Sequence, residues 1–133
     1  MSIDTWEPSN PDPEFSIDRA VLREFIQLSR NDQLMQLPNR LSPEVCDQQR
    51  PLMRLPRETW TKAAADFNNE ELLHLVRFFT VAEQMLDGWE AAEKSPVIWL
   101  VRELRRRKAP PDRDLLLWIK ANSDNRFLPN GAL

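Results

Sequence analysis

The only histidine of the 133-residue sequence, His74, is the side chain best suited to transfer protons near neutral pH. It follows Glu70 by one helical turn and precedes Arg77 by three residues. Such a histidine serves an enzyme when it activates a nucleophile, and no serine or cysteine stands close to it in the sequence. The pattern favours a partly exposed histidine that pairs with Glu70 or Glu71. An enzyme that uses His74 is therefore the least favoured of the three functions that we consider.

The single cysteine, Cys46, is the second candidate for chemistry, and it directly precedes Asp47. A reactive thiol needs a cationic neighbour that favours the thiolate, and no basic residue flanks Cys46. We therefore predict a buried or inert thiol. A single cysteine also excludes a disulfide within the chain, which is typical of a reducing compartment, so we expect a cytoplasmic location.

The composition leaves no way to build the common metal and nucleotide sites. A structural zinc site takes four cysteine or histidine ligands, and a di-iron bundle takes two Glu-x-x-His motifs. The chain has one cysteine and one histidine, so it supplies neither set. Its two glycines, Gly88 and Gly131, cannot form a glycine-rich phosphate loop or a dinucleotide-binding fingerprint. We therefore predict no metal and no cofactor.

Pairs of acidic residues occur at three places. The pairs in residues 70–71 and 112–114 open predicted helices, where the helix dipole favours negative charge. The third pair, Glu90 and Glu93, flanks two alanines in a connecting segment. Hydrolases use two carboxylates that face each other across a cleft, and the spacing alone does not indicate such a cleft. We interpret Glu90 and Glu93 as solvated surface.

A tryptophan among arginines is the most informative surface pattern. A helical projection places Trp99, Arg102, Glu103 and Arg106 on the side opposite the apolar stripe of their segment. Tryptophan and arginine are enriched among the residues that dominate binding energy at protein interfaces. Arginine also donates paired hydrogen bonds to carboxylates, so we predict that this face binds another protein with an acidic surface. The alternative is that another helix or the tail covers Trp99.

Two further groups of residues are candidates for partner binding. Phe127 and Leu128 are the one apolar pair in the C-terminal tail, and we expect them to lie beside or over the Trp99 face. Three arginines on the first predicted helix form a secondary basic face: Arg19, Arg23 and Arg30. Ile26 is expected to lie among these arginines.

Nucleic-acid binding through the basic end of the fifth helix, Arg102–Lys108, is the alternative function. The net charge is −3, but residues 101–133 hold eight Lys/Arg against four Asp/Glu. A helix-turn-helix needs a polar recognition helix after a short turn. The segment after this basic end reads Leu-Leu-Leu-Trp-Ile over residues 115–119, which we expect to be buried. The acidic net charge and this sequence make nucleic-acid binding less favoured than protein binding.

Six segments have the apolar spacing or the capping residues of helices. Their predicted ranges are Ile17–Arg30, Pro43–Gln49, Pro56–Phe67, Asn69–Asp87, Pro96–Lys108 and Asp112–Ala121. Ser16 and Asn68 are predicted N-caps, and Gly88 is predicted to end the fourth helix. Prolines leave the remainder of residues 31–55 as loop, because they break any long helix.

No segment shows the period of two that indicates a strand, so the predicted fold class is all-α. We expect an irregular bundle of five to six helices with polar N- and C-terminal tails. Residues 1–15 are predicted to be a flexible, proline-rich, acidic leader, or an extended segment held by Trp6 and Phe15. Residues 16–121 form one helical domain, and residues 122–133 form a polar C-terminal tail.

The function that the sequence favours is a small cytosolic protein-interaction or regulatory module with no catalytic activity of its own. No apolar run approaches the roughly 20 residues of a membrane span, so no membrane partner is expected. The sequence makes no prediction about the oligomeric state.

Overall fold

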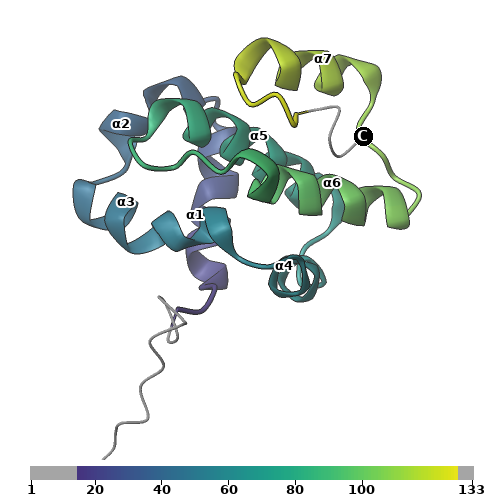
Figure 1. The fold of residues 1–133 in the computed structure, drawn as a ribbon, viewed down its shortest axis with the longest axis horizontal. Coiled ribbons are helices and arrows are strands. Elements are labelled where there is room, and N and C mark those ends of the chain that lie inside the picture. The colour runs from purple at the N-terminus through teal and green to yellow at the C-terminus, as the bar shows by residue number, and fades with distance from the viewer. Residues whose placement is uncertain (1–14, 129–133) are drawn as a thin grey trace, which may run out of the picture.

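Helices account for most of residues 15–128, which are the residues described in the computed structural model (Figure 1). The α-helices of this range are α1 (Arg19–Arg30), α2 (Leu37–Arg40), α3 (Pro43–Gln49), α4 (Arg57–Ala64), α5 (Asn69–Met85), α6 (Pro96–Arg106) and α7 (Arg113–Asn122). Three 3₁₀ helices connect them: Leu34–Gln36, Arg50–Arg54 and Ala92–Lys94. These residues contain no strand, so the predicted all-α class is confirmed, with seven helices instead of five to six.

The additional helix lies in residues 31–55, where the prolines predict mostly loop. The predicted helix α3 has the expected bounds, and the Ser42 hydroxyl accepts the N–H of Val45 as its cap. Pro38 stands in the first turn of α2, where a missing N–H leaves no hydrogen bond unmade. Pro51 likewise stands at the start of a 3₁₀ helix. The prolines thus divide this segment into short helices instead of preventing helices altogether.

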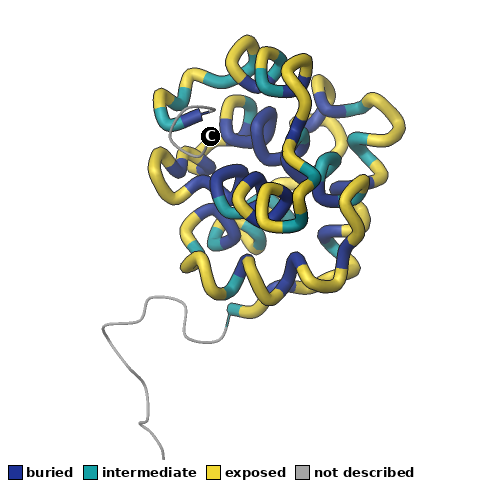
Figure 2. The backbone as a smooth tube through the Cα atoms, turned by 90° about the vertical axis from the view of Figure 1, so that its right-hand side faces the viewer, coloured by how far each residue is buried: buried dark blue, intermediate teal, exposed yellow. Residues whose placement is uncertain are grey.

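The longest helix, α5, lies at the centre and contacts α1, α6 and α7 (Figure 1). Its residues 78–83 are all buried, so this part of the helix is covered on every side. Around it the other helices alternate between buried and exposed positions (Figure 2). The position of α5 decides which faces of its neighbours are available to solvent.

Four aromatic side chains form the middle of the core. Phe25 of α1 stacks on Phe78 of α5 with ring centroids 3.9 Å apart. Phe79 meets Phe25, Phe78 and Trp60 of α4 edge to face, at centroid distances of 6.1, 5.1 and 5.4 Å. The Trp60 indole donates its N–H to the carbonyl of Leu52 at 3.3 Å. This cluster joins α1, α4 and α5 through rings that are at most 1% exposed.

Local capping sets the start of α5, as the sequence predicts, and also the start of α7. Asn68 accepts the N–H of Glu71, and the Glu71 carboxylate accepts the N–H of Asn68, both at 2.8 Å. This reciprocal pair is a capping box. At the start of α7 the Asp112 carboxylate accepts the N–H of Leu115 at 2.8 Å. These interactions join residues three apart, so they need no tertiary partner.

Two predicted helix caps are wrong. α1 begins after Asp18, whose carboxylate accepts the N–H of Ala20 and takes the capping role predicted for Ser16. α5 ends at Met85, so Gly88 lies in the turn after the helix and does not cap it directly. Gly88 has a φ of 81°, a backbone conformation that glycine adopts without strain.

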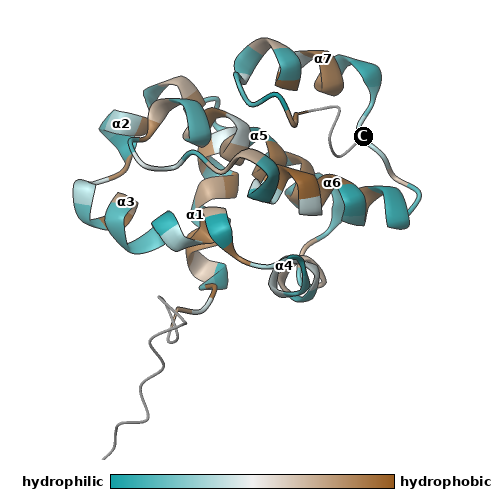
Figure 3. Cartoon of the chain, in the orientation of Figure 1, coloured by the Kyte–Doolittle hydropathy of each residue, from teal (hydrophilic) through white to brown (hydrophobic). Residues whose placement is uncertain are grey.

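The exposure of two helices also differs from the prediction. Ile26 is expected among exposed arginines, but it is 1% exposed because α1 packs along α5. In the run 115–119 of α7, Leu117 is 52% exposed and Trp118 is only partly buried. α7 rests on α5 with one face, so only the first and last residues of the run are buried. Figure 3 shows the hydrophobic middle of this helix at the edge of the bundle.

The segment after α7 packs back against the other helices. The Asn125 side chain donates to the carbonyl of Ala92 at 2.9 Å, and Leu128 is 5% exposed within the core. Phe15, at the other end of the described range, is partly buried against the core.

Residues 1–14 and 129–133 are not described, so most of the predicted leader, with Trp6, and the end of the predicted tail lie outside the described residues. Among residues 15–128, no helix combines the length and apolar character needed to cross a membrane.

Candidate functional site

The face predicted to bind a partner lies on α6, where Trp99 and Arg102 come together. The Arg102 guanidinium carbon lies 5.3 Å from the centroid of the Trp99 ring, which is within cation–π range. Trp99 is partly buried, and its indole N–H has no hydrogen-bond acceptor in the described part of the chain. Arg102 is exposed and forms no ion pair with any carboxylate of residues 15–128. The three-residue spacing that brings these side chains together is the one the sequence predicts.

Arg106, a predicted member of the same face, binds Glu103 one turn earlier. Its Nε donates to Glu103 Oε1 at 3.0 Å. Arg107 donates from its Nε to Glu103 Oε2 at 2.8 Å. The helical projection places Glu103 on the exposed side, but the two guanidinium groups cover it and leave it 6% exposed. Arg106 is therefore engaged within its own helix, although 71% of its side chain is exposed.

Arg107 joins three helices. Its guanidinium donates to the carbonyl of Ala64, the last residue of α4, at 2.8 Å, and to the carbonyl of Phe67, between α4 and α5, at 2.9 Å. It also donates to the side chain of Asn69 at the start of α5, at 3.1 Å. The Ala64 carbonyl also accepts the N–H of Phe67 at 3.0 Å, so Arg107 adds a second donor to it. Part of the basic end of α6 thus holds the helices together. We call Glu103 and Arg107, with the groups that they bind, the Glu103 joint.

The pKa of Glu103 predicts how the joint responds to acid. The hydrogen bond from Arg106, followed by that from Arg107, lowers this pKa below its ordinary value of 4.5 and outweighs the effect of burial. A carboxyl group with a lowered pKa in the folded state stabilises the fold above its ordinary pKa, and this contribution is lost as the pH falls through the lowered value.

We therefore expect the free energy of unfolding to fall as the pH decreases below about 4.5. Glu103→Gln is expected to lower the stability at pH 7 and to make its decrease in acid shallower. Urea unfolding of both proteins between pH 7 and pH 3 measures this difference. Parallel curves for the two proteins would show that Glu103 does not contribute to the acid response.

The other two predicted partner-binding residues lie on the segment after α7. Leu128 is part of the core and is not accessible to a partner in the folded chain. Phe127 is partly buried, and the guanidinium carbon of Arg126 lies 5.1 Å from its ring centroid. Phe127 lines a pocket beside α5 and the segment that connects α5 to α6. The predicted set therefore divides into the Trp99–Arg102 pair, the Glu103 joint and this pocket.

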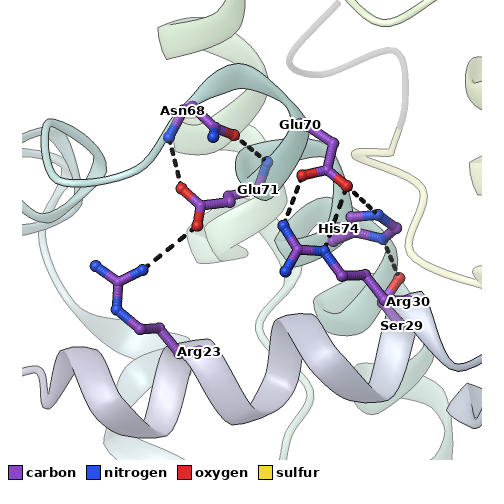
Figure 4. A network of polar contacts seen from close by, with 7 residues as sticks. All are labelled: Arg23, Ser29, Arg30, Asn68, Glu70, Glu71 and His74. Carbon is purple, nitrogen blue, oxygen red and sulfur yellow. Dashed lines mark hydrogen bonds and ion pairs between the residues drawn. The ribbon is translucent and has the colours of Figure 1, made fainter.

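The three arginines of the predicted secondary basic face each bind an acidic residue that lies outside α1. The pairs are Arg19–Asp66, Arg23–Glu71 and Arg30–Glu70, with N–O distances of 2.6, 3.3 and 2.6 Å. Figure 4 shows Arg23 and Arg30 reaching from α1 toward the start of α5. This basic face thus contributes to the packing of α1 and has carboxylate partners within the fold.

His74 belongs to the same network (Figure 4). Its Nε2 lies 3.2 Å from Glu70 Oε2, the predicted pair, and its Nδ1 lies 2.7 Å from Ser29 Oγ. Serine, histidine and a carboxylate are also the set that many hydrolases use. A pocket of about 320 Å³ is lined by His74 and Glu70 but not by Ser29. A molecule in this pocket would contact the His74 imidazole but not the Ser29 hydroxyl. The arrangement therefore fits a structural link between α1 and α5 better than a catalytic serine with a histidine base.

Cys46 is partly buried, and burial, followed by the charge of Asp47, raises the pKa of its thiol. A raised thiol pKa disfavours the reactive thiolate. Within residues 15–128, no group of three or more histidine, cysteine or acidic side chains is arranged to hold a metal ion.

A pocket of about 500 Å³ lies between α5, the Ala92–Lys94 3₁₀ helix and the segment before Leu128. Its charged and aromatic lining residues are Glu83, Glu90, Glu93, Asp124, Arg126 and Phe127. The sequence analysis missed Glu83. Glu83 follows Phe79 by four residues, so it lies on the apolar stripe of α5. A carboxylate on an apolar stripe is the sequence signal that could have marked Glu83 as a candidate.

Comparison of the chain with protein-family models, with curated proteins and with solved structures finds no match.

Proposed function

We propose that this chain is a small cytosolic protein-interaction or regulatory module, without catalytic activity of its own, that binds an acidic partner through Trp99 and Arg102. The observation that carries the proposal is the exposed Arg102 guanidinium over the Trp99 ring, with no carboxylate partner in residues 15–128. A guanidinium without such a partner can donate paired hydrogen bonds to the carboxylate of another protein.

The neighbouring arginines support a narrow site instead of a broad basic surface. Arg106 and Arg107 both bind Glu103, so their guanidinium groups have a carboxylate partner within residues 15–128, whereas Arg102 has none there. A pair consisting of one tryptophan and one free arginine suits a protein interface, where a few such residues dominate the binding energy. Nucleic-acid binding would need a wider row of uncompensated cations that follows a phosphate backbone.

The test compares Arg102→Glu with a matched control. Arg40→Glu on α2 makes the same change of charge at another exposed arginine. Both variants are expected to keep the stability of the parent, because exposed substitutions usually change it little. We expect the parent and Arg40→Glu to capture the same proteins from cytosol. Arg102→Glu is expected to capture none of these proteins, as quantified by mass spectrometry.

Retention on RNA or heparin at increasing salt separates the alternative function from the proposed one. A folded Arg102→Glu variant that keeps every captured protein would contradict the proposal. Salt-sensitive RNA binding that is lost with Arg102→Glu would support the nucleic-acid alternative instead.

A further inference from the structure

The pocket beside α5 has a strong excess of negative charge. Four carboxylates line it, from Glu83, Glu90, Glu93 and Asp124, against the single cation of Arg126. Glu90 and Glu93 are exposed, and their carboxylates form no hydrogen bond or ion pair with any other residue of the range 15–128. A concave surface with one sign of charge concentrates ions of the opposite sign.

Glu83 is the buried member of this group, with 5% of its surface exposed. Its Oε2 accepts the backbone N–H groups of Ala91 and Ala92, at 2.9 and 3.3 Å, and the Asn125 side-chain amide at 3.1 Å. Its Oε1 has only the same Asn125 amide, at 3.3 Å. All of these donors are neutral, and no cation of the described chain pairs with the carboxylate. A buried carboxylate is ordinarily paired with a cation as well as hydrogen-bonded, so Glu83 leaves a charge uncompensated beside the pocket.

The arrangement of these carboxylates excludes a simple metal site. No three acidic, histidine or cysteine side chains of residues 15–128 converge in the way that a metal ion requires. Their charges are instead distributed around a volume of about 500 Å³, which has room for an organic group. An extended cation can approach several separated carboxylates at once.

The aromatic wall indicates what kind of organic cation fits. The Arg126 guanidinium carbon lies 5.1 Å from the Phe127 ring centroid, so a cation of this chain already occupies the face of this ring. Aromatic rings attract ammonium and guanidinium groups through their negative faces. The alkyl chain that carries such a group can pack on the same ring.

We infer that this pocket binds a ligand that carries an ammonium or guanidinium group on an alkyl chain. The carboxylates of Glu90 and Glu93 meet the cation, Phe127 contacts the alkyl chain, and Glu83 adds its uncompensated charge from below the surface. Two sources provide this chemistry, a free polyamine and a lysine or arginine side chain of a peptide. This site is distinct from the Trp99–Arg102 pair, so either proposal can fail without the other.

Isothermal titration calorimetry with spermidine and with the peptide acetyl-Gly-Lys-Gly-amide tests the inference on the full chain. We expect saturable binding of at least one probe at low ionic strength, where exposed charges are least screened. Glu90→Gln combined with Glu93→Gln is expected to weaken that binding about tenfold, since each removes one exposed ion pair. These exposed changes leave Glu83 and its hydrogen bonds in place, so the fold is retained.

The matched control is Glu24→Gln combined with Glu44→Gln, which removes the same charge from α1 and α3. It is expected to leave the affinity unchanged. Phe127→Leu keeps an apolar side chain and is expected to weaken binding about threefold through loss of the ring face. Arg126→Gln removes the competing cation and is expected to strengthen binding.

The relative affinities of the two probes identify the source of the ligand. Tighter binding of spermidine favours a free polyamine, and tighter binding of the peptide favours a basic segment of a partner protein. No saturable binding of either probe would overturn the inference. An equal loss of affinity in the control pair would also overturn it, because the attraction would then come from net charge and not from this pocket.

Discussion

Replacement of Arg107 by alanine is expected to lower the free energy of unfolding by about 1.5–3 kcal/mol, as the loss of hydrogen bonds to a charged group does. The guanidinium is the donor for Glu103, for the carbonyls of Ala64 and Phe67 and for Asn69. Without it, the Glu103 carboxylate keeps Arg106 as its one cationic partner, and the Phe67 carbonyl loses its donor. Urea unfolding followed by far-UV circular dichroism measures the change.

Arg106→Ala is the matched control, because Arg106 binds the same carboxylate from the exposed side. Its cost is expected to be at most about 1 kcal/mol, the range of exposed ion pairs. Arg107→Lys keeps the charge but loses the planar set of donors, so its stability is expected to lie between that of the parent and that of Arg107→Ala. Equal losses from Arg106→Ala and Arg107→Ala would show that the contacts with α4 contribute nothing to stability.

Phe79→Ala is expected to cost about 3–5 kcal/mol, as the deletion of a buried aromatic ring does. Phe79 is 0% exposed and meets three other rings, so its removal opens a cavity between α1, α4 and α5. Measurement of the thermal and urea unfolding of this variant tests the central place of the cluster.

Trp118→Ala is the comparison for this prediction. Trp118 is larger than Phe79, but it is partly exposed, and Arg77 lies over its ring at 5.0 Å. Its loss is expected to cost less than about 2 kcal/mol, because solvent already covers part of the ring. A larger loss from Trp118→Ala than from Phe79→Ala would contradict the structure, in which the core centres on α5 and not on α7.

The helical class and most helix starts follow from local sequence. The caps at Ser42, Asn68 and Asp112 join residues three apart, so the chemistry of a few neighbouring positions decides them. The Trp99–Arg102 pair is local in the same sense, because a three-residue spacing on a helix brings two side chains together wherever the helix lies.

Helix exposure depends on neighbours far along the chain, and here the sequence misleads. Leu117 belongs to an apolar run, but α7 packs on α5 through Leu115 and Ile119, and Leu117 between them is 52% exposed. Ile26 stands among charged residues, and the packing of α1 along α5 buries it. Periodicity predicts that a helix has an apolar face, whereas the arrangement of the bundle decides how wide that face is.

Tertiary structure also decided which charges remain available for binding. Arg23, Arg30 and Arg107 bind groups about 40 or more positions away, so their engagement cannot be read from local spacing. Glu83 is likewise joined to Asn125, 42 positions along the chain, at the edge of the acidic pocket. Hydrogen bonds within one helical turn depend on the neighbouring sequence, but ion pairs and pockets depend on which segments the packing of apolar surfaces brings together. Local spacing therefore sets most of the helices and the Trp99–Arg102 pair, whereas the packing of the helices brings Arg23, Arg30 and Arg107 to their distant partners and places four carboxylates around one pocket.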